Sequence, residues 1–412
     1  MLLPHHPDVS TDASYASNAH KHHTKMAPRK PWMTVHFNRK QKLWLTAFGA
    51  ISIWLLVYYH THSASDPTSF FFQPAHTYQI QRQRYISRAQ EARHILSINK
   101  QAASANQTLS VCVGIPTVKR PLTQHLNTTI ATLLDGLSHT QQSQIAIHVL
   151  FAHVRPQQHP DFQHAWVPRL VDQVFTYETL NAPVSVLRRL ERERRIVEKA
   201  RFDYRLLLES CLRTAAPWIL MLEDDVLAER YWYNQTMRVL DAASQSKTTW
   251  LYLRLFSTAR FLGWSAEDWP GYLGWSVLVV MATGGLGLAA RRVRCCREIL
   301  TRSFLAVVCF VCVPLSILLY FLAGRVTVSP MQPGLHVMNH GGCCSQALLF
   351  PREHVPMVAK RLEKTSKVPV DSVLENLGGS LEMDRLVVSP SLMQHVGESS
   401  YKERVVYGND IW

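Results

Sequence analysis

The chain has 412 residues and a formal net charge of +14, from 44 Lys and Arg residues against 30 Asp and Glu residues. This length allows two or three domains with a substantial buried core. The basic residues are dispersed over several segments and form no basic-aromatic motif, so we expect no nucleic-acid partner. Much of the positive charge instead flanks apolar segments, where the topology of a membrane protein requires it.

The N-terminal part of the chain contains one apolar run between two polar segments. Residues 1–42 are rich in His, Ser, Thr and Lys and predict a disordered cytosolic tail. Residues 43–59 (LWLTAFGAISIWLLVYY) are uncharged and approach the roughly 20 residues that a helix needs to cross a bilayer. Because this run begins far from the N-terminus and lacks a small-residue cleavage site, we interpret it as an uncleaved signal anchor. Residues 60–105 are polar and predict a stem, with a helical stretch over residues 79–99.

From about residue 106 the sequence pattern alternates between strands and helices. Such alternation predicts an α/β domain with a mainly parallel sheet. The predicted strands cover residues 110–115, 145–152, 218–222, 250–256, 347–350 and 385–389. The predicted helices cover residues 122–137, 184–212 and 355–364.

Two further apolar runs, residues 271–290 and 303–324, interrupt this alternation. Their length predicts a transmembrane hairpin, and a buried core helix is the alternative interpretation of each run. The loop between them, residues 291–302, carries five Arg residues against one Glu residue. The positive-inside rule therefore places this loop in the cytosol, together with the N-terminal tail.

Three spans from a cytosolic N-terminus place residues 60–270 and 325–412 on the same, luminal side. Strand signals occur on both sides of the hairpin, and residues 325–412 are too short for a separate domain with this sheet content. We therefore predict one α/β domain, formed by residues 106–270 and 325–412, that is split by a transmembrane hairpin over residues 271–324.

The predicted luminal segments carry features that suit an oxidising, glycosylating compartment. Three Asn-X-Thr sequons are expected glycosylation sites, at Asn106, Asn127 and Asn234. Four cysteines are expected to be available for disulfides, with no connectivity specified by the sequence: Cys112, Cys211, Cys343 and Cys344.

An acidic cluster, Glu223-Asp224-Asp225, follows the apolar strand WILML directly. In an open parallel sheet, ligands bind outside the carboxyl ends of the strands. Three neighbouring acids repel one another unless a cation lies among them, and carboxylates prefer hard divalent metals that in turn bridge phosphate oxygens. The cluster therefore indicates a metal and nucleotide-diphosphate site. An acidic helix N-terminus is the alternative interpretation.

Two other segments favour the metal interpretation. Residues 111–120 (VCVGIPTVKR) end a strand with a Gly and continue into polar and basic residues that suit a nucleotide contact. Residues 389–400 (SPSLMQHVGESS) place His395 after a strand, where it serves either as a metal ligand or phosphate contact, or as a structural residue.

The three segments VGIPTVKR, Glu223-Asp224-Asp225 and PSLMQHVGESS together resemble GT-A glycosyltransferases of the branching N-acetylglucosaminyltransferase-IV-like group. The tandem apolar pair inside the α/β domain resembles, more particularly, the Golgi family that adds N-acetylgalactosamine to the glycan of GPI anchors. This resemblance covers about residues 40–412. It implies a GT-A-like (Rossmann-like) domain on the luminal side of the Golgi membrane, a UDP-sugar donor, a Mn²⁺ or Mg²⁺ ion, and a GPI-anchor glycan next to membrane lipid as the acceptor.

The resemblance also implies roles for individual residues. Asp225 would be the main metal ligand, with Asp224 beside it in the metal and nucleotide motif, and Glu223 nearer the nucleotide sugar. His395 would complete the metal site. The first nucleotide-contacting loop would be formed by Pro116, Thr117 and Arg120.

An inverting transferase also needs a general base to take the proton of the acceptor hydroxyl. Asp371 in KVPVDSVLENL lies before a helical stretch at about the position that the resemblance implies, and Glu375 is the second candidate. A helix N-cap is the alternative role for Asp371.

The sequence thus predicts a metal-dependent, inverting glycosyltransferase that transfers a sugar, N-acetylgalactosamine from its UDP donor, to a GPI-anchor mannose. The alternatives are the same fold with UDP-galactose or UDP-N-acetylglucosamine, and a non-catalytic membrane glycan-binding or scaffold protein.

Overall fold

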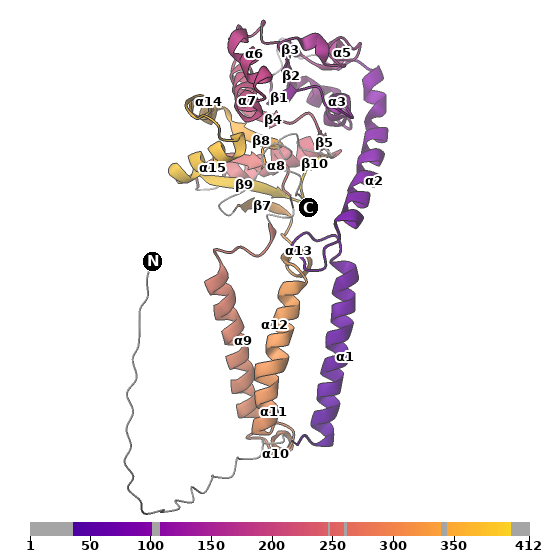
Figure 1. The fold of residues 1–412 in the computed structure, drawn as a ribbon, viewed down its shortest axis with the longest axis vertical. Coiled ribbons are helices and arrows are strands. Elements are labelled where there is room, and N and C mark those ends of the chain that lie inside the picture. Colours follow the sequence, from indigo (N-terminus) through magenta and orange to yellow (C-terminus); the bar gives the residue numbers. More distant parts are fainter. Residues whose placement is uncertain (1–35, 101–107, 246–247, 259–261, 339–343, 397–412) are drawn as a thin grey trace, which may run out of the picture.

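The computed structural model describes residues 36–100, 108–245, 248–258, 262–338 and 344–396. An α/β domain lies at one end of the molecule and three long helices lie at the other (Figure 1). The predicted glycosylation site Asn106 and the cysteine Cys343 lie outside the described residues.

One eight-stranded sheet organises the α/β domain, in the order β3-β2-β1-β4-β8-β6-β9-β7. β8 pairs antiparallel with both β4 and β6, and β7 pairs antiparallel with β9, whereas the other pairings are parallel. The sheet is therefore mixed, and the prediction of a mainly parallel sheet misses β8 and β7. The strands are β1 (Val111–Thr117), β2 (Ile145–Phe151), β3 (Gln173–Phe175), β4 (Trp218–Leu222), β6 (Trp250–Arg254), β7 (Gly334–Val337), β8 (Ala347–Pro351) and β9 (Asp384–Ser389).

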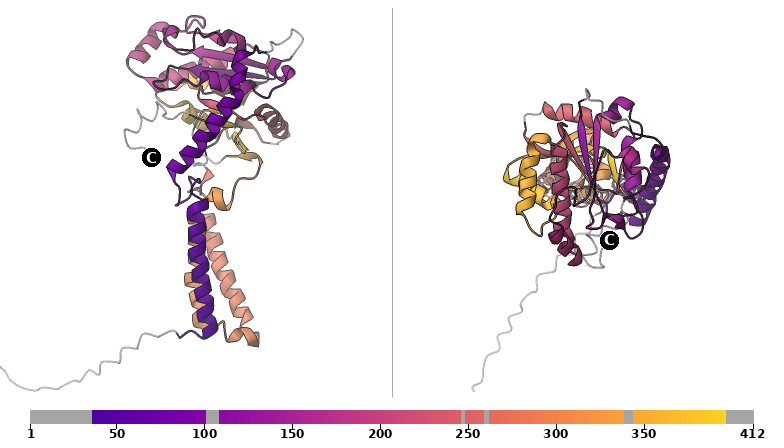
Figure 2. Two further views of the ribbon diagram at one scale, coloured as in Figure 1. Left: turned by 90° about the vertical axis from the view of Figure 1, so that its right-hand side faces the viewer. Right: turned by 90° about the horizontal axis from the view of Figure 1, so that it is seen from above.

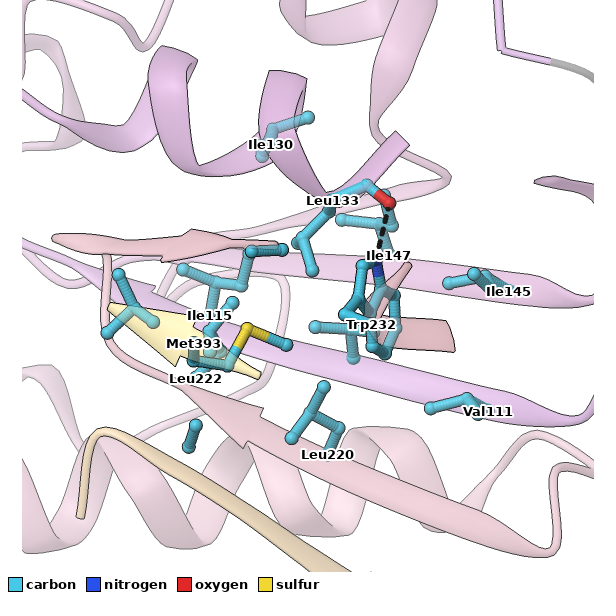
Figure 3. Close-up of a cluster of buried hydrophobic side chains, with 14 of the residues drawn as sticks. Val111, Ile115, Ile130, Leu133, Ile145, Ile147, Leu220, Leu222, Trp232 and Met393 are labelled. Atoms are coloured by element: carbon cyan, nitrogen blue, oxygen red, sulfur yellow. Dashed lines mark hydrogen bonds between the residues drawn. The ribbon is translucent and has the colours of Figure 1, made fainter. Parts of the chain in front are cut away.

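Helices cover both faces of this sheet, because successive residues of each central strand point to opposite sides. The face that includes Val113 of β1 packs against α3 (Leu126–Leu134) and α8 (Trp232–Ser244). Figure 3 shows this core, in which the Trp232 indole N–H donates to the Leu133 carbonyl at 2.9 Å. The face that includes Cys112 packs against α7 (Ile196–Leu212), α14 (Val355–Lys364) and α15 (Val370–Ser380). The α/β class predicted from the sequence is confirmed.

The predicted helix over residues 184–212 is two helices. α6 (Val184–Arg192) and α7 (Ile196–Leu212) are separated by a turn in which Arg194 has a φ of 53°. A left-handed residue ends a helix, and charged patterning alone gives no signal for such a break. α7 is then tied to β1 by a disulfide between Cys112 and Cys211.

Three helices are long and apolar enough to cross a membrane. They are α1 (Arg39–His62), α9 (Trp269–Ala290) and the continuous helix over residues 302–322. The third consists of α11 (Arg302–Val307), the π-helical turn η4 (Val308–Cys312) and α12 (Val313–Leu322). α9, α11 and α12 lie between β6 and β7 in the chain, although both strands belong to the one sheet.

Polar contacts attach α1 to the α9–α12 pair at both of its ends. Near the start of α1, the Gln41 amide donates to the Thr301 hydroxyl at 3.0 Å and to the Ile299 carbonyl at 2.6 Å. Beyond its other end, the Asp66 carboxylate accepts from the Thr327 backbone N–H at 2.8 Å and from the Thr327 hydroxyl at 2.9 Å. These contacts join the three long helices near both ends.

The segment after α1 packs on the α/β domain. α2 (Pro74–Ala92) and the short helix η1 (Arg93–Ser97) run along α3 (Figure 1). The buried Arg88 forms an ion pair with Asp135, and its Nε donates to the Ala228 carbonyl at 2.8 Å. Residues 74–97, within the stem predicted for residues 60–105, thus contribute packing that the sequence pattern did not indicate.

The remaining elements are short. They are α4 (His139–Ser143), η2 (Pro156–Gln158), α5 (Val167–Leu170), β5 (Val226–Ala228), α10 (Arg294–Arg297), α13 (Arg325–Val328), η5 (Arg352–His354) and β10 (Met393–His395). β5 and β10 form a two-stranded antiparallel sheet of their own.

Candidate functional site

The acidic cluster lies at the carboxyl edge of the parallel strands. β4 ends at Leu222, directly before Glu223, and β1 ends beside it at Thr117. Because β8 runs antiparallel to β4, the residues that precede β8 reach the same edge, and the Ser345 hydroxyl donates to Glu223 at 3.0 Å. Three strands therefore bring residues from distant parts of the chain to one place, as expected for a ligand site in an open α/β sheet.

Asp224 is the most enclosed carboxylate of the cluster. It is 4% exposed and accepts hydrogen bonds from the Thr117 hydroxyl at 2.6 Å and from Arg120 Nε at 3.1 Å. His159 extends this network, because its Nδ1 accepts from the Asp161 backbone N–H at 3.1 Å and its Nε2 lies 3.0 Å from the Thr117 hydroxyl. Both oxygens of Asp224 are thus occupied by residues of the chain.

Asp225 shares Arg120 with Asp224 but otherwise has a different environment. The small sheet pairs His395 with Val226, and this pairing brings His395 Nε2 to 3.2 Å from Asp225 Oδ2. The same Oδ2 lies 3.0 Å from Arg120 Nη2. Asp225 Oδ1 is buried and has no hydrogen-bond partner among the described residues. A buried carboxylate oxygen without a partner is costly and indicates an additional ligand.

Glu223, Asp225 and His395 form a group that is able to hold a metal ion. One ligand atom of each lies within 4.8 Å of the ligand atoms of the other two. The donor set of two carboxylates and one imidazole suits a hard to borderline divalent cation. Asp224 does not belong to this group, although the sequence predicted it as a metal ligand beside Asp225.

The electrostatics of the group favour an ionised Asp225. Burial by itself raises the pKa of the Asp225 carboxyl, but the hydrogen bond from His395 and the charges of His395 and Arg120 outweigh burial and lower that pKa to about 2. Burial lowers the pKa of His395, and the hydrogen bond to Asp225 and its charge reverse this and raise the pKa. A carboxylate that stays charged at neutral pH is what a divalent cation requires.

Arg120 lies between the two aspartates. It contacts Asp224 through Nε and Nη2, and Asp225 through Nη2 alone. Burial lowers the pKa of Arg120, and the charges of Asp224 and Asp225 overcome this effect and raise it. Since its side chain is 21% exposed, the guanidinium remains accessible from the edge of the sheet. It is a fixed positive charge beside the candidate metal group.

The two candidate bases lie on α15 in unequal environments. Asp371 Oδ2 accepts from the Cys344 backbone N–H at 3.1 Å, and Asp371 Oδ1 accepts from the Ser372 N–H at 2.8 Å. Cys344 precedes Ser345, which contacts Glu223, so Asp371 lies beside the acidic cluster.

Glu375, one turn further along α15, is enclosed by polar side chains from the sheet. Arg254 Nη2 donates to Glu375 at 2.8 Å, Arg385 Nε lies 3.6 Å from its other oxygen, and the Tyr252 hydroxyl also contacts it. The Glu375 side chain is 13% exposed and that of Arg254 is 2% exposed. Glu375 is thus part of a buried ion-pair network.

Of the other predicted site residues, Pro116 lies inside β1, where it pairs with Leu150 of β2, and is not in the loop that follows. The glycosylation candidate Asn234 is exposed on α8, whereas Asn127 is half-buried in α3.

Three residues near the cluster were not predicted from the sequence: Ser345, His159 and His125. The His125 charge contributes to the lowered pKa of Asp225, and His125 lies just before α3. Each of the three is a single polar residue in an irregular segment, so no sequence pattern marks it. Ser345 could have been found only from knowing that β8 runs antiparallel to β4.

The fold and the site define an α/β protein with three membrane-spanning candidates and a candidate divalent-cation centre at the carboxyl edge of its sheet. The family model described as GPI-N-acetylgalactosamine transferase PGAP4 matches residues 111–394, from β1 to β10. The match covers more than half of the chain, and the chain belongs to this family. Its members are glycosyltransferases that act on the GPI glycan. No curated protein matches the sequence.

Proposed function

We propose that the chain is a metal-dependent, inverting glycosyltransferase of the GT-A type that transfers N-acetylgalactosamine from its UDP donor to a mannose of the GPI glycan. The observation that carries the metal-dependent part is the buried Asp225 Oδ1, which has no hydrogen-bond partner among the described residues and lies in a group with Glu223 and His395. The family match supports the sugar and the acceptor.

The metal is proposed to be Mn²⁺ or Mg²⁺, held by Asp225 and His395 with Glu223 beside them. Such an ion, when bound, neutralises charge on the diphosphate of the leaving group. The lowered pKa of Asp225 supports this assignment, because the carboxylate is ionised before any ion binds. Asp224 is proposed to act differently: it orients Arg120 and Thr117, since both of its oxygens already accept hydrogen bonds from them.

Arg120 is proposed to contact a phosphate oxygen of the donor. Its guanidinium is held by Asp224 on one side and remains partly exposed on the other. A planar guanidinium with several N–H groups binds phosphate well, and a fixed one loses little side-chain entropy on binding. Thr117 at the end of β1 is proposed to support this loop through its hydrogen bond to Asp224.

Asp371 is proposed as the general base for the acceptor hydroxyl. It lies beside the acidic cluster through Cys344 and Ser345, and its carboxylate accepts hydrogen bonds from the backbone N–H groups of Cys344 and Ser372. Glu375 is a weaker candidate, because two arginines and a tyrosine surround it.

The proposed location is the Golgi membrane, with α1, α9 and α11–α12 as spans, the N-terminus in the cytosol and the α/β domain in the lumen. The support is the length and composition of the three helices and the Arg-rich loop between α9 and α11. A new Asn-X-Thr sequon near Glu353 should become glycosylated, whereas one in the loop over residues 291–302 should not. The reverse pattern would contradict the proposed topology.

The proposed reaction is tested by supplying the purified full chain with a GPI-anchored protein and a panel of UDP-sugars. UDP-N-acetylgalactosamine should give transfer, and the rate should vanish with a chelator and return with Mn²⁺ or Mg²⁺. Full activity in chelator would contradict the proposed metal dependence. Transfer from UDP-galactose alone would show that galactose, and not N-acetylgalactosamine, is the donor sugar. The anomeric configuration of the product, measured by NMR, should be opposite to that of the donor.

A further inference from the structure

Two adjoining cavities lie at the end of the helix pair α9 and α12 that faces the α/β domain. One, of about 530 Å³, lies between the two helices, and the other, of about 570 Å³, lies above it at the start of α9. Trp264, Tyr272 and Trp275 line both cavities and so join them into one groove. This groove lies apart from the acidic cluster, because none of its lining residues belongs to that cluster.

Small residues at the other end of α9 explain why the helices leave a groove here. A Cβ on Gly287 would lie 2.4 Å from a methyl carbon of Leu305, and one on Gly284 would lie 3.5 Å from the Cys309 sulfur, so the helices pack closely there. Gly271 and Gly274, at the domain end, have no atom within 4 Å of the corresponding position. Figure 1 shows the same difference, with α9 and α12 closest near α10 and further apart toward the domain.

The two cavities differ in chemistry. The cavity between the helices is lined by apolar and aromatic side chains, including Val279, Val313 and Ile317. The upper cavity contains Glu267, Asp268 and Arg325. One N–H of the Arg325 guanidinium donates to the Gly263 carbonyl at 3.0 Å, and a guanidinium carries further N–H groups for an anionic ligand. An apolar slot below a charged mouth is the pattern that suits an amphiphile.

We propose that this groove binds the phospholipid part of the acceptor, with one hydrocarbon chain between α9 and α12 and the phosphodiester at Arg325. The proposal rests on the proposed function, since it takes the acceptor to be a glycan on a phosphoinositide lipid. The carboxylates of Glu267 and Asp268 suit hydrogen bonds from inositol or sugar hydroxyls, and the Arg325 guanidinium suits the phosphate. The aromatic residues at the mouth lie where Trp and Tyr favour a membrane interface.

The functional consequence concerns acceptor affinity. A hydrocarbon chain held in the groove places its own glycan next to the domain, so the transferase binds the tethered acceptor more tightly than a lipid-free glycan. Burial of even a few methylene groups is worth about a tenfold change in affinity. The lipid should therefore lower KM for the acceptor and leave kcat nearly unchanged.

The test compares two acceptors and two variants of the full chain in detergent. The acceptors are an intact GPI-anchored protein and the same protein after phosphatidylinositol-specific phospholipase C has removed its diacylglycerol. Val279→Trp fills the groove, and Val277→Trp adds the same side chain at a position of α9 that is 52% exposed and does not line the groove. Val279→Trp should raise KM for the intact acceptor about tenfold, toward the wild-type value for the lipid-free acceptor, whereas Val277→Trp should not. Equal effects of the two variants, or one KM for both acceptors in the wild type, would overturn the proposal.

A second measurement does not depend on the fold of a variant. Phosphatidylinositol with a diazirine in the middle of one acyl chain should label residues 269–290 of the wild-type chain more strongly than phosphatidylcholine with the same chain. Equal labelling by the two lipids would mean that bulk lipid fills the groove and would overturn the proposal. If the wild type transfers sugar to neither acceptor but phosphatidylinositol still labels selectively, the proposed function fails and the groove stands as a phospholipid site.

Discussion

Two groups of buried carboxylates lie near the carboxyl edge of the sheet, and their surroundings differ. In the first, Asp225 shares one oxygen with His395 and Arg120 and leaves the other without a hydrogen-bond partner among the described residues. In the second, Glu375 is enclosed by Arg254 and contacts of Tyr252 and Arg385. In the first group one arginine, Arg120, pairs with two aspartates, whereas in the second two arginines pair with one carboxylate.

This difference indicates which carboxylates are available for chemistry. The charge of Glu375 is balanced by two arginines of the chain, although its Oε2, like Asp225 Oδ1, has no hydrogen-bond partner among the described residues. The net stabilisation by such buried pairs is often small. Asp225 differs because its unpartnered oxygen belongs to a group with Glu223 and His395, which together suit a cation from outside the chain. Asp224 and Asp225 show the same contrast at adjacent positions, because only Asp224 has both oxygens occupied by neighbouring residues.

The largest expected effect is that of Asp225→Asn. An amide cannot supply the charge that a hard cation requires, so transfer should fall by at least about 10³-fold. The shape of the side chain is kept, so the thermal unfolding midpoint should stay close to that of the wild type. Transfer rates, Mn²⁺ binding followed by electron paramagnetic resonance, and thermal unfolding measure the three quantities. If Asp225→Asn keeps Mn²⁺ binding and activity, Asp225 does not hold the cation. The proposed difference between the Asp225 and Glu375 groups would then be wrong.

The second prediction concerns Asp371. As general base, Asp371→Asn should lower kcat by roughly 10²- to 10⁴-fold, with donor binding retained because the residues of the acidic cluster are intact. If Asp371 serves only as a helix cap, Asp371→Asn should change kcat and stability little, since Asn caps nearly as well as Asp. Single-turnover rates and the affinity for UDP separate the two outcomes. Near-normal turnover in a folded Asp371→Asn protein would move the search to Glu375.

Local patterns in the sequence were sufficient for much of this architecture. The apolar run over residues 218–222, ended by three acids, predicted both β4 and the place of the acidic cluster. The three long helices were predicted from uncharged runs, which depend on composition alone. The helix over residues 355–364 was also predicted, because its apolar periodicity is regular. In each case the signal lies within one short segment.

The rest depends on contacts between distant residues. Local patterning does not distinguish Asp224 from Asp225, and only the family resemblance singled out Asp225. The difference in their surroundings comes from Thr117 and Arg120, which are more than 100 residues away. The antiparallel placement of β8 brings Ser345 to Glu223 across 122 positions, and periodicity does not encode strand direction. The network around Glu375 likewise joins α15 to β6, and no local pattern indicates it.

The smallest effect on turnover is expected for Glu375→Gln. This variant tests whether the second group of carboxylates serves stability and not catalysis. Removing the charge leaves Arg254 and Arg385 buried without their carboxylate, and breaking a buried pair in this way costs about 3–5 kcal/mol. The matched control is Glu363→Gln, because the Glu363 side chain is 63% exposed and its ion pair with Arg205 spans 3.6 Å. Exposed pairs of this kind contribute little to stability.

Thermal unfolding in detergent should therefore show a clear drop of the midpoint for Glu375→Gln and almost none for Glu363→Gln. The kcat per folded molecule should stay near the wild-type value in both variants, because Glu375 is engaged by Arg254 and Arg385 in the fold and Asp371 is the proposed base. A stable Glu375→Gln protein with strongly reduced turnover would reverse the assignment. Glu375 would then be the base, its arginines would serve to orient it, and the two groups of carboxylates would form a single catalytic site.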